Sequence, residues 1–96
     1  MPSVFFFVDS IVKIKELRKL IDKIDDQLFD LLVERFDVSK KIGDIKASKN
    51  INIDDPNREQ EIIDRLSIKL EGKLKKEDIE TIIRSFYYIS KKLQKK

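Results

Sequence analysis

Three basic residues, Arg18, Arg35 and Lys46, lie along one apolar stripe in the first half of the sequence. The stripe recurs at steps of three and four residues, which is typical of a long helix with a narrow apolar seam. Its positions are Ile14, Leu17, Ile21, Ile24, Leu28, Leu31, Arg35, Val38, Ile42 and Ile45. Arg35 occupies a seam position, and the other two cations each follow one directly. A cation at a seam position can specify the register of paired helices, but it needs an anionic partner. No acidic residue occupies another seam position, so a bound anion is the other possibility.

Polar residues also fall on the inward faces of the two later helices. They are Asp55, Arg58, Glu59, Ser90 and Gln94. Buried polar groups are costly unless they find partners, so the whole set is more informative than any member. The set of eight contains four cations and two carboxylates, an excess of two positive charges. That balance suits a small dianion, and arginine binds carboxylates through two parallel hydrogen bonds.

Each of these residues also has a purely structural interpretation. An aspartate before a proline caps a helix, and charges in a first turn are commonly solvated. Polar residues near a chain end can belong to a frayed turn, which applies to Ser90 and Gln94. Arg18 and Lys46 can lay their stems along the seam and keep their charges in water.

The elements that must position these groups are helices. Residues 11–49 contain no proline and predict one helix about 55–60 Å long. A compact monomer of 96 residues has a radius of gyration of only about 12–13 Å, so the seam predicts pairing in an obligate homodimer. We divide the chain into an N-terminal apolar arm, residues 1–10, and a helical domain, residues 11–96. The arm could be a short strand, an artefact of the chosen start codon or a strap over the partner subunit, and we favour the strap. Asp9 or Ser10 is predicted to cap the helix that follows.

Two further helices follow a polar loop at residues 48–55. Asp55 and Pro56 form a start signal, and the second helix is predicted over residues 56–70. A turn around Gly72 leads to a third helix over residues 76–94. The apolar faces comprise Ile62, Ile63, Leu66, Leu70, Ile79, Ile82, Ile83, Phe86 and Tyr87. The predicted fold class is all-α, with three helices per chain and a long first helix.

The spacing of the cations predicts a site shared between subunits. Arg35 and Lys46 are separated by about 16–17 Å along a helix and lie near one face, so both can reach one ligand. Arg18 and Lys46 are about 42 Å apart and cannot do so from the same helix. An antiparallel dimer brings the partner's Arg18 to the site. Two equivalent sites, each built from both chains, are therefore expected.

Composition narrows the function further. The chain has no cysteine and no histidine, which removes thiol chemistry and the commonest general base and metal ligand. Its longest apolar run, residues 4–8, is too short for a membrane span and lacks the basic flank typical of a signal peptide. Basic residues are spread among 18 acidic ones rather than gathered into a stripe. We expect a cytoplasmic protein that uses no metal or cofactor and binds neither nucleic acid nor membrane.

A series of short motifs resembles the all-helical class of chorismate mutases over about residues 11–94. They are Leu17-Arg18, Ile21-Asp22, Ile24-Asp25, Glu34-Arg35, Gly43-Asp44-Ile45-Lys46, Asp55-Pro56-Asn57-Arg58-Glu59, and Ser90 followed by Gln94. The resemblance implies an intertwined all-α homodimer in which the long first helices cross between subunits. It also implies the rearrangement of chorismate to prephenate, toward phenylalanine and tyrosine, without a cofactor.

The same resemblance implies a role for each site residue. Arg35, and Arg18 of the partner subunit, would bind the two carboxylates of chorismate. Lys46 and Gln94 would donate hydrogen bonds to the ether oxygen of the breaking C–O bond.

The remaining residues would complete the contacts with substrate. Glu59 would accept a hydrogen bond from the ring hydroxyl, with Asp55 nearby. Ser90 and Arg58 would supply the other carboxylate and hydroxyl contacts.

Two other functions remain open. Related proteins of the same fold are isochorismate-pyruvate lyases with a similar cationic pocket, although Glu59 and Ser90 favour the mutase. The long seam and the pI of about 9.1 also permit a non-catalytic helical module for dimerisation or nucleic-acid binding.

Overall fold

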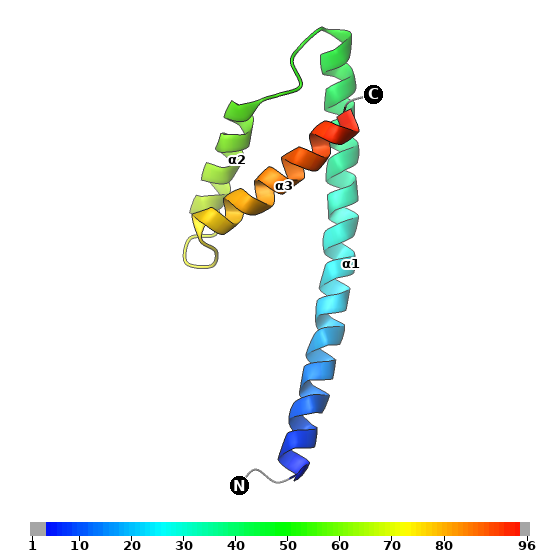
Figure 1. Ribbon diagram of the computed structural model, residues 1–96, viewed down its shortest axis with the longest axis vertical. Coiled ribbons are helices and arrows are strands. Elements are labelled where there is room, and N and C mark those ends of the chain that lie inside the picture. Colours follow the sequence, from blue (N-terminus) through cyan, green and yellow to red (C-terminus); the bar gives the residue numbers. More distant parts are fainter. Residues whose placement is uncertain (1–3, 95–96) are drawn as a thin grey trace. The chain divides into compact units, whose positions relative to one another are not determined.

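The computed structural model describes residues 4–94, with side chains from Phe7 onward. Over that range the chain forms three α-helices and no strand: α1 (Val4–Ser48), α2 (Pro56–Lys69) and α3 (Lys76–Gln94) (Figure 1). The all-helical prediction is confirmed. The chain divides into two units, Met1–Arg35 and Phe36–Lys96, and the boundary falls within α1.

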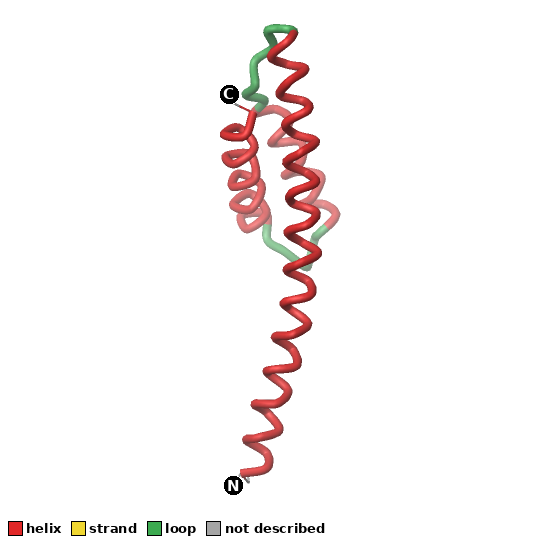
Figure 2. The backbone as a smooth tube through the Cα atoms, turned by 90° about the vertical axis from the view of Figure 1, so that its right-hand side faces the viewer, coloured by secondary structure: helices red, strands yellow, loops and turns green. Residues whose placement is uncertain are grey.

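Helix α1 begins at Val4 and not at Ile11, so the first helix starts seven residues earlier than predicted (Figure 2). Asp9 and Ser10 lie inside the helix, and the prediction that one of them is its cap is wrong. Residues 4–10 contain no proline or glycine, so a helix propagates through them at one hydrogen bond per residue. A strand is therefore excluded for residues 4–9. Met1, Pro2 and Ser3 of the predicted arm lie outside the described residues.

The end of α1 follows from one asparagine. Asn50 has a φ of 55°, in the left-handed region that asparagine tolerates better than most residues. Its conformation turns the chain so that the amide of Ile51 donates to the carbonyl of Lys46 at 2.8 Å. This reversal satisfies a terminal carbonyl of the helix and starts the loop toward α2.

The predicted start of α2 is confirmed. Asp55 is the N-cap, and its side chain accepts a hydrogen bond from the amide of Arg58 at 3.1 Å. Pro56 stands at the first helical position, where a missing N–H costs nothing. Gly72, with a φ of 79°, lies in the turn between α2 and α3. Helix α3 has the predicted bounds.

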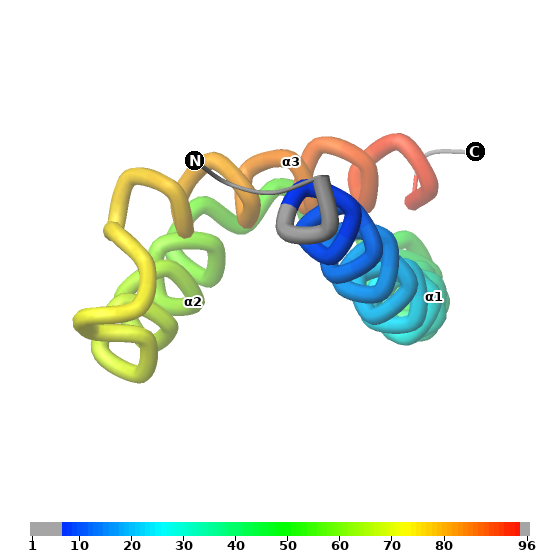
Figure 3. The backbone as a smooth tube through the Cα atoms, turned by 90° about the horizontal axis from the view of Figure 1, so that it is seen from below, coloured from blue at the N-terminus to red at the C-terminus, as the bar shows by residue number. Residues whose placement is uncertain are grey.

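The core of the second unit lies between α2 and α3, which are joined by a short turn and packed side by side (Figure 3). Ile62 and Ile63 of α2 and Ile79 and Ile83 of α3 are buried in it. Partly buried side chains surround them: Leu66, Leu70, Phe86 and Tyr87. Ile82, which belongs to the predicted apolar face, is 43% exposed in the single chain.

One aromatic contact joins α1 to α3 within this unit. The rings of Phe36 and Phe86 meet edge to face with centroids 6.5 Å apart. The contact packs the middle of α3 against α1 near Phe36.

The apolar seam of α1 is exposed in the single chain. Its aliphatic side chains are between 46% and 62% exposed: Ile14, Leu17, Ile21, Ile24, Leu28, Leu31, Val38, Ile42 and Ile45. Among the described residues, no helix is both long and apolar enough to span a membrane.

Candidate functional site

The last turn of α3 places Gln94 against α1. Its amide nitrogen, Nε2, lies 2.8 Å from the carbonyl oxygen of Ser39 and 2.7 Å from the Ser39 hydroxyl. The two residues are 55 positions apart in the sequence, and both are half-buried. Ser39 is a residue that the sequence analysis missed. It lies next to a seam position, and nothing in its local sequence marks it as a partner of Gln94.

Lys46 lies on the same stripe of α1 as this contact. Ser39, Gly43 and Lys46 follow one another at steps of four and three residues, so they line one face of the helix. Lys46 is half-buried, and its stem is not free in water. The fold therefore brings a cation and the residue that holds Gln94 to one face of α1. Lys46 and Gln94 can both donate hydrogen bonds, as the predicted site requires, whereas Ser39 accepts from Gln94.

Ser90 lies one turn before Gln94 on α3. It is only 3% exposed, and its hydroxyl oxygen has no hydrogen-bond partner within the described part of the chain. Because α3 continues to Gln94, the interpretation of Ser90 as part of a frayed end is wrong. A buried hydroxyl without a partner is costly, which agrees with a ligand contact, but that role of Ser90 stays a prediction.

Glu59 is the best shielded carboxylate of the predicted set. Only 15% of its side chain is exposed, and its Oε1 lies 3.8 Å from Nη1 of Arg84 on α3. It is therefore not a freely solvated first-turn charge. Its place one turn before Ile62 and Ile63 puts it at the end of the α2–α3 core. A carboxylate held there can accept a hydrogen bond.

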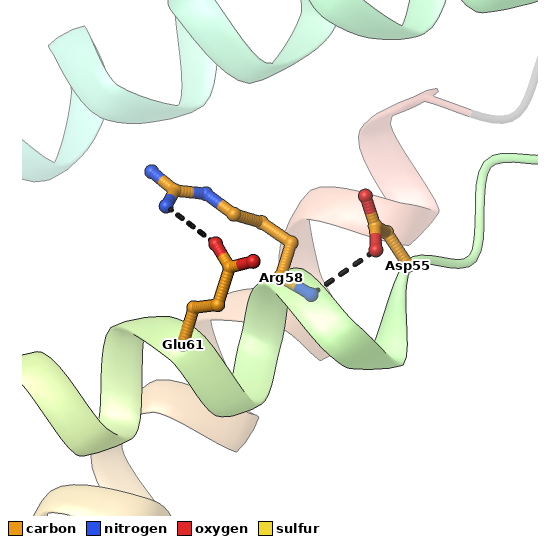
Figure 4. A network of polar contacts seen from close by, with 3 residues as sticks. All are labelled: Asp55, Arg58 and Glu61. Carbon is orange, nitrogen blue, oxygen red and sulfur yellow. Dashed lines mark hydrogen bonds and ion pairs between the residues drawn. The ribbon is translucent and has the colours of Figure 1, made fainter.

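Asp55 and Arg58 have local partners on α2 (Figure 4). Asp55 serves as the N-cap described above. Arg58 directs Nη1 to Oε2 of Glu61 at 3.3 Å, and more than half of its side chain is exposed. Asp55 is therefore a helix cap, and Arg58 is an exposed charge in the first turn, as their structural interpretations predicted. A role in ligand binding stays a prediction for each residue.

The two arginines predicted to bind carboxylates belong to the first unit. Arg18 is exposed on α1, and Arg35 is half-buried. Their approach to residues of the second unit, in the same chain or another, stays a prediction.

Together the second unit offers donors from Lys46, Gln94 and Ser90, and an acceptor from Glu59. Within residues 4–94 no cluster of three or more histidine, cysteine or acidic side chains is arranged to hold a metal ion. Such a set can orient a polar anion and stabilise charge that develops on an oxygen atom.

Comparison with known proteins agrees with this chemistry. The bifunctional chorismate mutase/prephenate dehydratase of Aquifex aeolicus is 46% identical over 54 residues, which is 56% of this chain and 15% of that protein. The chorismate mutase of Methanocaldococcus jannaschii is 43% identical over 56 residues, which is 58% of this chain and 57% of that protein. The chain therefore aligns with less than two thirds of the length of either relative. The family model for chorismate mutase type II matches residues 17–95, and this chain belongs to that family.

Proposed function

We propose that this chain is a chorismate mutase that rearranges chorismate to prephenate in the biosynthesis of phenylalanine and tyrosine. One observation supports the proposal beyond family membership. Gln94 contacts Ser39 and Gly43, on the same stripe of α1 that bears Lys46, which favours a shared role for Gln94 and Lys46 as donors. The reaction requires such donors where negative charge develops.

The proposed reaction is pericyclic. Within one molecule the ether C–O bond breaks as a C–C bond forms, and the electrons move in a closed ring. No proton, leaving group or second reactant is needed, and no covalent intermediate forms on the protein. What the protein must supply is a compact conformer of a flexible dianion, and electrostatic stabilisation of the ether oxygen.

Binding of the substrate and stabilisation of its transition state are assigned to different residues. Arg35, with Arg18 of the partner subunit, binds the two carboxylates and holds the substrate folded. Lys46 and Gln94 donate to the ether oxygen, which gains negative charge in the transition state.

The other predicted residues orient the ring. Glu59 accepts from the ring hydroxyl, with Asp55 nearby. Ser90 offers its unpartnered hydroxyl to the substrate. Arg58 would have to leave Glu61 to reach the ligand.

The proposal includes an intertwined homodimer. The half-exposed aliphatic seam of α1 supports it, because a contiguous apolar stripe of this kind marks an interface. In an antiparallel pair the seam is covered and Arg18 reaches the partner's site. We further propose that the enzyme acts in the cytoplasm and needs no cofactor, nucleic acid or membrane.

The test is purified protein with chorismate, with substrate loss followed by absorbance and the product identified. The Arg35→Ala variant is the control, since the parent is expected to form prephenate and the variant far less. Release of salicylate and pyruvate from isochorismate, with chorismate turned over slowly, would assign the lyase activity instead. A folded dimer that converts neither substrate would contradict the proposal.

A further inference from the structure

We propose that Ser39 and Gly43 are positioning residues that hold Gln94 with one amide N–H available to the reacting oxygen. This inference rests on the proposed function, in which Gln94 donates to the ether oxygen. Neither residue needs to touch the substrate. Both act through Gln94, which lies against them on α1.

The carbonyl of Ser39 decides which way the Gln94 amide points. A side-chain amide has a donor end and an acceptor end of nearly the same shape, and only its partners distinguish them. A backbone carbonyl can only accept, so the atom 2.8 Å from the Ser39 carbonyl oxygen must be Nε2. The acceptor end, Oε1, therefore cannot take that place, where it would repel the carbonyl.

The hydroxyl of Ser39 strengthens this orientation. Its Oγ lies 2.7 Å from the same Nε2, so two acceptors from one residue converge on one nitrogen. An amide nitrogen carries two hydrogens, and we assign one of them to the two Ser39 acceptors and the other to the substrate. Any residue at position 39 supplies the carbonyl, but the second acceptor comes from the serine side chain and is lost in alanine.

Gly43 makes room for the side chain. A Cβ added at Gly43 would lie 2.6 Å from Cγ and 2.9 Å from Cβ of Gln94, closer than such atoms approach. These atoms are the base of the Gln94 side chain, so they cannot swing aside without moving the amide. A glycine inside a helix is unfavourable compared with alanine. Its presence here in a buried position is explained by the space that Gln94 occupies.

Together the two residues form a seat for Gln94. The glycine admits the aliphatic stem, and the serine fixes the amide at the tip. A donor that is oriented before the substrate arrives needs no reorganisation during the reaction, which is the condition for electrostatic preorganisation. Looser orientation should reduce kcat more than it raises KM, because the ether oxygen gains its charge only in the transition state.

The experiment is a double-mutant cycle on kcat between Ser39→Ala and Gln94→Ala. Ser39→Ala alone is expected to lower kcat about 3- to 10-fold with little change in KM, since one neutral hydrogen bond is lost and the carbonyl remains. Ser39→Thr keeps a hydroxyl and should recover most of the loss. With Gln94 already replaced by alanine, Ser39→Ala should have no further effect. Ser67→Ala is the matched control, because Ser67 is a half-buried helical serine whose hydroxyl donates to its own helix.

The Gly43→Ala variant provides an independent test of the same proposal. The added methyl group should displace the Gln94 side chain and lower kcat about 10- to 100-fold. Thermal stability should not fall in proportion, because alanine favours the helix.

Two patterns of results are distinguishable. If Gln94→Ala itself leaves kcat unchanged, the role of Gln94 in the proposed function fails. If Gln94→Ala lowers kcat but Ser39→Ala has no effect, or the same effect in both backgrounds, the positioning role is overturned while the proposed function stands. Full activity of the Gly43→Ala variant would likewise overturn the proposal that Gly43 positions Gln94.

Discussion

Glu59 of α2 and Arg84 of α3 form an ion pair of 3.8 Å in which the carboxylate is shielded and the guanidinium is exposed. The contact joins Oε1 of the carboxylate to Nη1 of the arginine. The pair spans the two helices that build the core, so it helps to hold Glu59 where a substrate hydroxyl would need an acceptor.

Arg84→Gln is expected to lower kcat/KM only about 2- to 5-fold, because the arginine of the pair is largely exposed and its contact of 3.8 Å is long. Glu59→Gln should cost more, since it removes the charged acceptor itself. Steady-state kinetics on chorismate measure both, with Arg65→Gln as a control for loss of one positive charge on α2. A larger loss in Arg84→Gln than in Glu59→Gln would show that the arginine, not the carboxylate, contacts the substrate.

Lys46→Ala is expected to lower kcat about 10²- to 10³-fold or more, because one donor to the developing negative charge is lost. The dimer should survive, since Lys46 is outside the apolar seam. Lys40→Ala removes an exposed lysine from the same helix and should leave kcat unchanged. Normal turnover by Lys46→Ala, with dimerisation verified by light scattering, would remove Lys46 from the site.

Gln94→Glu tests the orientation of the amide through pH. A carboxylate cannot donate, so kcat at neutral pH should fall about 10²- to 10³-fold. The carbonyl of Ser39 would face the new carboxyl group and disfavour its charged form, which raises its pKa above the usual value of about 4.3. Activity relative to the parent should therefore rise as the pH is lowered toward that pKa. A ratio that stays flat from pH 8 to pH 5 would argue against donation from position 94.

Mixing Arg18→Ala with Arg35→Ala tests the shared site. Each variant alone should be nearly inactive, because every site lacks one arginine. In a mixed dimer one site regains both arginines and the other loses both, so activity should return in proportion to the mixed dimers formed. Subunit exchange can be followed with differently tagged chains. Complete exchange without recovery would mean that Arg18 does not act across the interface.

The lowered pKa of Asp64 makes the stability of the folded chain depend on pH in the acid range. Its hydrogen bond with Gln60 and, next, its contact with Lys76 hold the pKa of Asp64 below its ordinary value of 3.8. The charged form is therefore favoured in the folded state, and this stabilisation is present above the unfolded pKa and lost as the pH falls through the lower folded pKa. Asp64→Asn should lower Tm slightly at neutral pH and make no difference in strong acid. Thermal melts by circular dichroism measure the difference, and a gap that widens in acid would contradict the assignment.

The sequence by itself determined the local features of this protein. The cap at Asp55, the proline after it, the turn at Gly72 and the bounds of α3 all depend on neighbouring residues, and all are as predicted. The start of α1 was misjudged, because an apolar run without helix breakers can be read as a strand, a strap or a helix.

Only the tertiary structure decided which side chains meet. Periodicity shows that Ser39, Gly43 and Lys46 share a face, but it gives neither the height nor the rotation of another helix against that face. The packing of Phe86 on Phe36 and of α3 on α1 sets both, and so places Gln94 on residues 55 positions away. The pair of Ser39 and Gln94 exists because of that packing, since neither residue carries a local signal for the other.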